Sequence, residues 1–199
     1  MRMIAGEARG RTIVAPRGQD TRPTQDYVRE SLFNILRETV VEARVLDLFA
    51  GSGALALEAV SRGAAEATLV DSASEAAQCI RKNMETLRFQ ERTRFLQADW
   101  RQALERLSRE GRAYTLVFLD PPYRMTDTGS VCARLADLGL LETDALVVIE
   151  HRREHVPTPD ARFMETDARR YGDTAIHFYR YRGEAQRDAH EPVRVPGEL

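Results

Sequence analysis

The sequence predicts an α/β fold with a mostly parallel sheet, because short apolar runs alternate with segments whose apolar residues recur at helical spacing. Strands are expected at residues 45–49, 67–71, 93–98, 114–120, 145–150 and 175–181. Crossover helices are expected at 53–62, 74–88, 100–110 and 129–138. A chain of 199 residues with 43% hydrophobic content can fill one core, so one main domain is expected.

The two ends of the chain differ from this alternating pattern. Short runs joined through Gly6 and Gly10 predict a small N-terminal β-hairpin, within an extension that covers residues 1–23. A helix from Thr24 to about Val41 opens the main domain, which is expected to cover residues 24–182. The charged, aperiodic segment 183–199 is expected to be a disordered tail.

Composition excludes several classes of protein. A net charge of −2 gives no general attraction to nucleic acid, so any such contact needs a local basic patch. Cys79 and Cys132 lie far apart, which argues against a disulfide framework and fits a reducing cytoplasm. No apolar run is long enough to span a membrane. His151 and His155 match an inverted zinc motif, but they follow a strand rather than lie on a helix, so no metal is expected.

The first motif that predicts chemistry is a strand followed by a glycine-rich turn, Asp47-Leu-Phe49-Ala-Gly51-Ser52-Gly53. Glycines allow a ligand to approach the backbone closely at the start of the next helix. This turn also fits the dinucleotide-binding pattern and an ordinary tight connection, so the motif alone leaves three interpretations open.

Acidic residues at three strand ends favour S-adenosylmethionine as the ligand. Asp47 precedes the glycines, where a carboxylate suits the ammonium group of this cofactor and opposes a pyrophosphate. Asp71 ends the next strand, at the position expected for an acid that binds ribose hydroxyls. Asp99 ends the third strand and is either an acceptor for the adenine amine or a cap of the following helix.

The most informative motif is Asp120-Pro121-Pro122-Tyr123 at the end of an apolar strand. An exocyclic base amine is a weak nucleophile, because its lone pair is delocalised into the ring. The Asp120 carboxylate and the Pro121 carbonyl can accept its protons, and prolines make the loop stiff. The ring of Tyr123 offers a face on which an extruded base can stack. The alternative is a proline-rich turn without a catalytic role.

A modest basic patch lies near the N-terminus, where five arginines face two acidic residues (Arg2, Arg9, Arg11, Arg17 and Arg22 against Glu7 and Asp20). Arginine pairs well with phosphate, so Arg9, Arg11 and Arg22 are candidates for RNA contact. The alternative is that they are ordinary solvated surface residues.

Together these motifs resemble one enzyme family. The stretches Arg9-Gly-Arg11, Arg22-Pro-Thr24, Val28–Leu36, Asp47–Gly53 and Asp120–Tyr123 are similar to those of RsmD-type methyltransferases, which modify the N2 amine of a guanine in 16S ribosomal RNA. The resemblance covers about residues 1–182, and Glu150 and Tyr171–Thr174 also match. It departs from the family at Asp71, where a glutamate is expected, and in the tail, which has no counterpart.

The resemblance implies a Rossmann-like class I S-adenosylmethionine-dependent methyltransferase with a seven-stranded sheet and a small N-terminal hairpin. It implies as substrate 16S ribosomal RNA within the small subunit or an assembly intermediate, and we expect a cytoplasmic monomer. Other amine methyltransferases share the catalytic motif, so a DNA adenine-N6 enzyme is one alternative. A NAD-binding Rossmann protein and a non-catalytic RNA-binding factor are others.

Overall fold

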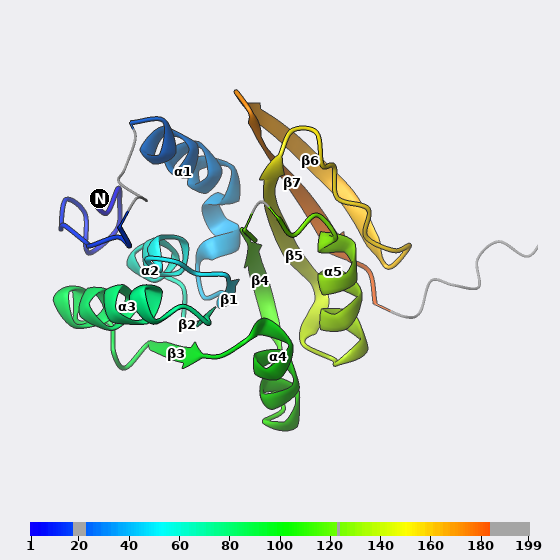
Figure 1. Cartoon of the computed structure of the whole chain (residues 1–199), viewed down its shortest axis with the longest axis horizontal. Helices are drawn as coiled ribbons and strands as arrows, with labels where there is room; N and C mark the ends of the chain where they lie inside the picture. Colours follow the sequence, from blue (N-terminus) through cyan, green and yellow to red (C-terminus); the bar gives the residue numbers. More distant parts are fainter. Residues whose placement is uncertain (18–22, 123, 184–199) are drawn as a thin grey trace, which may run out of the picture.

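A computed structural model describes residues 1–17, 23–122 and 124–183 and shows a twisted sheet between two layers of helices (Figure 1). The strands are β1 (Arg44–Leu48), β2 (Glu66–Asp71), β3 (Thr93–Gln97), β4 (Tyr114–Leu119), β5 (Leu141–Arg152), β6 (Phe163–Tyr171) and β7 (Thr174–Tyr181). The helices are α1 (Pro23–Leu36), α2 (Ala54–Ser61), α3 (Ser74–Leu87), α4 (Trp100–Arg109) and α5 (Thr128–Asp137), and a 3-10 turn, η1 (Arg37–Val40), follows α1. The predicted α/β alternation is confirmed.

The strand order is β3-β2-β1-β4-β5-β7-β6. Strands β1 to β5 are parallel to their neighbours, whereas β7 runs antiparallel to both β5 and β6. The chain moves from β1 outward to β3 and then returns to place β4 on the other side of β1. In open α/β sheets, ligands bind at this switch point, at the carboxyl ends of the strands.

Each face of the sheet has its own core. Helices α1, α2 and α3 pack on one face, where Phe33 of α1 meets Phe118 of β4 with ring centroids 5.9 Å apart. Helices α4 and α5 pack on the other face, against residues such as Val117 and Leu119. Because successive side chains of a strand point to opposite faces, the parity of a residue, that is its odd or even position along the strand, tells which layer of helices its side chain faces.

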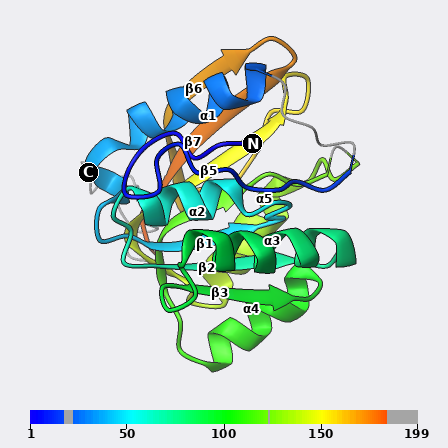
Figure 2. The same cartoon turned by 90° about the vertical axis from the view of Figure 1, so that its left-hand side faces the viewer.

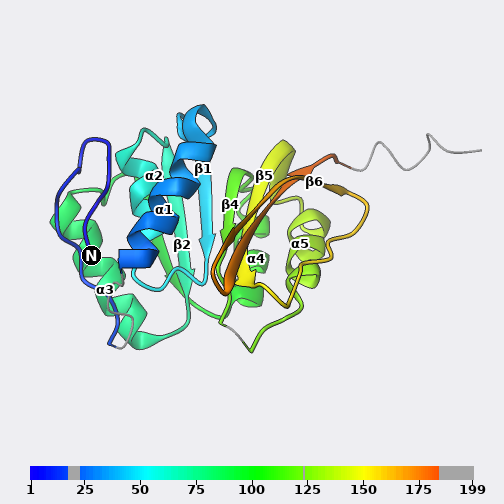
Figure 3. The same cartoon turned by 90° about the horizontal axis from the view of Figure 1, so that it is seen from above.

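The strand β6 was not predicted from the apolar runs, although the family resemblance implied a seventh strand. Most of its side chains are exposed, because it is an edge strand that pairs only with β7. The two strands are joined by Gly172 and Asp173, and Gly172 has a φ of 62°, as a tight hairpin turn requires. Figure 3 shows this hairpin at the end of the molecule away from α3 and the N-terminal segment.

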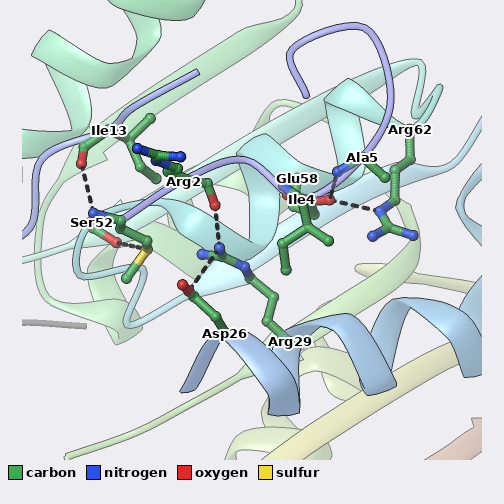
Figure 4. Close-up of polar contacts among 10 residues, drawn as sticks. Arg2, Ile4, Ala5, Ile13, Asp26, Arg29, Ser52, Glu58 and Arg62 are labelled. Carbon is green, nitrogen blue, oxygen red and sulfur yellow. Dashed lines mark hydrogen bonds and ion pairs between the residues drawn. The ribbon is translucent and has the colours of Figure 1, made fainter. Parts of the chain in front are cut away.

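The N-terminal segment, residues 1–14, folds back on itself as a short antiparallel hairpin, as predicted. A bridge joins Arg2 to Thr12, and on either side of it the amide of Met3 donates to the carbonyl of Arg11 and the amide of Ile13 donates to that of Met1, each at 2.9 Å. Between the two arms, the amides of Ile4 and Ala5 donate to the two carboxylate oxygens of Glu58 in α2, each at 2.9 Å (Figure 4). The hairpin lies along α2 and α3 (Figure 2).

This segment belongs to the same core as the helices beside it. The side chains of Met3, Ala8 and Ile13 are buried against α1, α2 and α3. Residues 184–199 lie outside the described part of the chain, so the expectation of a disordered tail concerns residues of which the structure describes only Gly183. No helix among residues 1–17, 23–122 and 124–183 is long and apolar enough to cross a membrane.

Candidate active site

Four carboxyl groups gather at the carboxyl edge of the sheet, on the face covered by α1, α2 and α3. The register pairs Leu48 with Leu119 and Leu119 with Ile149, so that Asp120 and Glu150 follow paired residues on neighbouring strands. Parity places Asp47 and Asp71 on the same face as this pair. The sheet therefore brings the predicted Asp47, Asp71 and Asp120 together at the switch point.

The Asp47 side chain is buried beneath this edge. One of its carboxylate oxygens accepts the backbone N–H of Ala56, in the first turn of α2, at 3.2 Å. The pKa of its carboxyl is raised to about 8, mainly by burial; the Ala56 hydrogen bond opposes this rise, and the nearby Asp120 and Asp71 add to it. A carboxyl in this condition has no cationic partner among the described residues, and a bound cation would stabilise its charged form.

The glycine turn between β1 and α2 is held by Asp71. One oxygen of Asp71 accepts the amide of Gly51 at 2.9 Å, and the other accepts the amide of Ala73 at 2.9 Å. Gly53 has a φ of 79°, and a Cβ at this position would lie 2.7 Å from a side-chain carbon of Leu69. The turn therefore requires glycine at 53, which explains that part of the motif physically.

The remaining predicted cofactor residues lie around this turn in different ways. Phe49 has a φ of 68°, and its ring meets Trp100 edge-on at 6.5 Å. Ser52 is buried, and its hydroxyl points to the sulfur of Met1 at 3.9 Å. Asp99 is exposed and caps α4 by accepting the amide of Arg101 at 2.9 Å. A cofactor role for these three residues stays a prediction.

The loop after β4 begins with Asp120 and two prolines. Pro121 is buried, and the carbonyl of Pro122 accepts the amide of Met125 at 2.8 Å, so the loop turns back on itself. Asp120 is exposed, yet the protein around it displaces part of its hydration and raises the pKa of its carboxyl. Tyr123, the predicted stacking residue, lies outside the described residues.

A narrow pocket lies between this loop and the end of β5, with Pro121, Thr128, Glu150 and His151 in its lining. Two buried polar atoms there, Oγ1 of Thr128 and Nε2 of His151, have no hydrogen-bond partner within the described part of the chain. Nδ1 of His151 lies 2.7 Å from the carbonyl of Arg152, so it carries the hydrogen and Nε2 is an acceptor. Burial lowers the pKa of His151, which keeps the ring neutral.

Two of the predicted RNA-binding arginines, Arg9 and Arg11, are far from this edge. The Arg11 guanidinium donates to the carbonyls of Thr86 and Leu87 at the carboxyl end of α3. Because a crossover helix starts at the carboxyl edge of a parallel sheet and ends at the opposite edge, Arg9 and Arg11 lie at the edge opposite Asp120. Arg22 lies outside the described residues.

Two polar residues, the buried Asn83 and the half-buried Glu150, were not predicted from the motifs alone. Asn83 of α3 donates to the carbonyls of Val14 and Ser52 at 2.8 and 2.9 Å, and it accepts the amide of Val14. It joins the N-terminal segment to the glycine turn, and a single asparagine on the apolar face of α3 was its only signal. Glu150 was noted only through the family resemblance.

Solved structures share this architecture. A putative methyltransferase of Escherichia coli superposes with a TM-score of 0.81 at 36% identity, covering 92% of this chain and 99% of that one. A putative S-adenosylmethionine-dependent methyltransferase of Streptococcus mutans has a TM-score of 0.67 at 16% identity, over 80% of this chain and 49% of that one. The fold is therefore the Rossmann-like fold of class I S-adenosylmethionine-dependent methyltransferases, as predicted.

Sequence comparisons define the family. A family model described as "Conserved hypothetical protein 95" matches residues 1–180, and the chain belongs to that family. Ribosomal RNA small subunit methyltransferase D of Escherichia coli is 37% identical over 190 residues, which cover 95% of this chain and 94% of that protein. A putative rRNA methyltransferase of Bacillus subtilis is 35% identical over 184 residues, covering 92% of this chain and all of that protein. The predicted resemblance to the RsmD-type family is confirmed.

Proposed function

We propose that this protein transfers a methyl group from S-adenosylmethionine to the N2 amine of a guanine in 16S ribosomal RNA. The observation that carries the proposal is the position of Asp120. Its carboxyl group ends β4 at the switch point, next to the buried Asp47, and makes no hydrogen bond to another described residue. Such an acceptor is available for an N–H donor of the substrate.

The residues around the glycine turn suit this cofactor better than a dinucleotide. S-adenosylmethionine supplies an electrophilic methyl group on a sulfonium, and it carries an ammonium group as well. Asp47 accepts a hydrogen bond from the amide of Ala56, and Asp71 accepts one from the amide of Gly51. The amides that would bind a pyrophosphate therefore already donate to carboxylates. The same carboxylates favour a cationic ligand, which argues against the NAD-binding alternative.

The chemistry assigned to the catalytic loop is proton acceptance and orientation. As the amine nitrogen bonds to the methyl carbon, the carbon–sulfur bond breaks and its electron pair stays on sulfur. The nitrogen becomes acidic, and the Asp120 carboxylate accepts one of its protons. Pro121 and Pro122 fix the backbone of the loop, which limits the positions the amine can take.

The RNA substrate is supported by the relatives and by one surface feature. The relatives of Escherichia coli and Bacillus subtilis are named as rRNA methyltransferases. Tyr27 of α1 is 63% exposed and meets Tyr171 edge-on at 6.3 Å, close to the turn between β6 and β7. An exposed aromatic ring near the catalytic edge can stack on an unpaired base. We propose that a cytoplasmic monomer acts on the small subunit or an assembly intermediate.

The test measures transfer of labelled methyl groups to small ribosomal subunits from cells that lack the endogenous enzyme, followed by nucleoside analysis. We expect N2-methylguanosine with the wild type and none above background with Asp120→Ala. Asp144→Asn, at the opposite end of β5, is the control and is expected to be fully active. Labelled N6-methyladenine in DNA, or no transfer to RNA, would contradict the proposal.

A further inference from the structure

The residue Glu150 lies beside Asp120 at the catalytic edge. It follows Ile149, which is paired in register with Leu119, and its parity places its side chain on the same face of the sheet as Asp120. Directly opposite Glu150, on the other side of β5, stands the apolar Ile176 of β7. The neighbouring charged groups on this face are therefore the carboxyls of Asp120 and, one strand further, Asp47.

No described residue satisfies the Glu150 carboxyl group. It makes no hydrogen bond or ion pair with residues 1–17, 23–122 or 124–183. Burial raises its pKa, and the adjacent Asp120 carboxyl adds to this effect. Glu150 is half-buried and Asp120 is exposed, so these two neighbouring carboxyls are accessible to a ligand that donates hydrogen bonds.

A second observation at the same place indicates a polar ligand. Glu150 and Pro121 line the narrow pocket whose other walls carry the unpartnered Oγ1 of Thr128 and Nε2 of His151. Thr128 is 3% exposed and His151 is 8% exposed, so water reaches neither freely. Glu150 thus shares one pocket with two residues that carry unpartnered polar atoms, next to the loop that begins with Asp120.

We propose that Glu150 is a specificity-determining residue that contacts the target base together with Asp120. The inference rests on the proposed function and deepens it. The edge of guanine presents its N2 amine next to N1–H, two neighbouring donors, whereas adenine presents its amine next to the acceptor N1. Two adjacent acceptor carboxyls match the guanine edge: Asp120 accepts from the amine and Glu150 accepts from N1–H. A protonated carboxyl still has one acceptor oxygen for this contact.

The experiment compares three variants in methyl transfer to small ribosomal subunits. Glu150→Met removes both acceptor oxygens at similar volume, whereas Glu150→Gln keeps one acceptor. We expect kcat/KM to fall tenfold or more with methionine, because N1–H then has no acceptor, and to fall less with glutamine. Glu142→Met, at the opposite end of β5, is the matched control and should keep wild-type activity.

Three readouts decide between explanations. In Glu150→Met the melting temperature should be no lower than in the wild type, which excludes misfolding. The calorimetric affinity for S-adenosylmethionine should be unchanged, which excludes a cofactor contact. Wild-type activity in Glu150→Met, equal losses with methionine and glutamine, or a matching loss of cofactor affinity would each overturn the inference. If the wild type produces no N2-methylguanosine, the proposed function itself is wrong. If the wild type produces it and Glu150→Met is equally active, only the inference about Glu150 is wrong.

Discussion

At the scale of single residues, the unusual feature of this site is an acidic side chain, Asp47, that is buried away from water. Asp47 is 1% exposed and has one hydrogen bond, from the amide of Ala56. Burial raises the pKa of this carboxyl to about 8, and the acidic neighbours Asp120 and Asp71 add to the effect, so the free protein holds it largely protonated at neutral pH. The arrangement makes sense when a cationic ligand occupies the site.

The cofactor affinity should therefore depend on pH. Because the pKa of Asp47 is about 8 in the free protein, binding an ammonium group requires the loss of a proton below that pH. We expect the dissociation constant of S-adenosylmethionine to decrease between about pH 6 and pH 7.5. Asp47→Asn should bind weakly and lose most of this dependence in isothermal titration calorimetry; a dependence equally steep in the variant would contradict the assignment.

The same residue should reduce the stability of the free protein. An aspartate whose pKa is about 8 when folded and about 4 when unfolded binds more protons in the folded state between these values, so stability falls as pH rises across that range. We expect Asp47→Asn to raise the unfolding free energy by about 1–2 kcal/mol at pH 8. At pH 4 the gain should vanish. Thermal melts of both proteins without cofactor, at both pH values, provide the measurement.

The sequence reveals some of these residues and conceals others. Asp47, Gly53 and Asp120 stand in motifs whose spacing relative to a strand end carries meaning, so they were predicted. Asn83 and Glu150 are single polar residues within a helix and a strand, and their importance depends on what the fold places beside them. Spacing along the chain does not contain that information.

At the scale of elements, the N-terminal segment combines a local pattern with tertiary contacts. Its glycines predict a hairpin, and the two arms do pair through their backbones. The amides between the arms donate to Glu58 and Ser61 of α2. Glu58 is fully buried and also pairs with Arg62 at 2.8 Å (Figure 4). Helix α2 therefore fixes where the hairpin lies on the protein, and no strand propensity in residues 1–14 could show this.

Removing the Glu58 carboxylate should release this segment. Glu58→Ala leaves the amides of Ile4 and Ala5 and the Arg62 guanidinium without their acceptor, and hydrogen bonds to a charged group contribute about 1.5–3 kcal/mol each. We expect a loss of at least about 2 kcal/mol in urea unfolding. Hydrogen exchange at Ile4 and Ala5 should accelerate as well. Glu85→Ala, on the exposed surface of α3, is the control, and equal effects of the two changes would contradict this account.

At the scale of the whole molecule, the parallel part of the fold was predictable and its antiparallel end was not. Strands β1 to β5 contain apolar runs between helices, whereas β6 is an exposed edge strand in which four of nine residues are charged. Its existence follows from the tight turn at Gly172 and from pairing with β7. Only the family resemblance anticipated a seventh strand.

The salt dependence of RNA binding tests whether the sheet edge opposite Asp120, where Arg9 lies, contacts the RNA. Each phosphate contact contributes about 0.7–0.9 to the slope of log K against log salt, so Arg9→Ala should flatten the slope by about that amount. Arg9 is preferable to Arg11, whose guanidinium stabilises the end of α3. Arg109→Ala, at the end of α4 on the other face, should leave the slope unchanged. An unchanged slope with Arg9→Ala would remove Arg9 from the interface.

If Arg9 and Arg11 contact the RNA, as we predict, their position at the carboxyl end of α3 sets a minimum size for a productive substrate. Helix α3 has 14 residues and is therefore about 20 Å long, and the catalytic carboxyls lie near its other end. A nucleic acid that reaches both the Arg9–Arg11 tip and Asp120 must span roughly six stacked nucleotides at about 3.4 Å each. Mononucleosides and trinucleotides would occupy one end of this footprint only, whereas a folded RNA domain can occupy both.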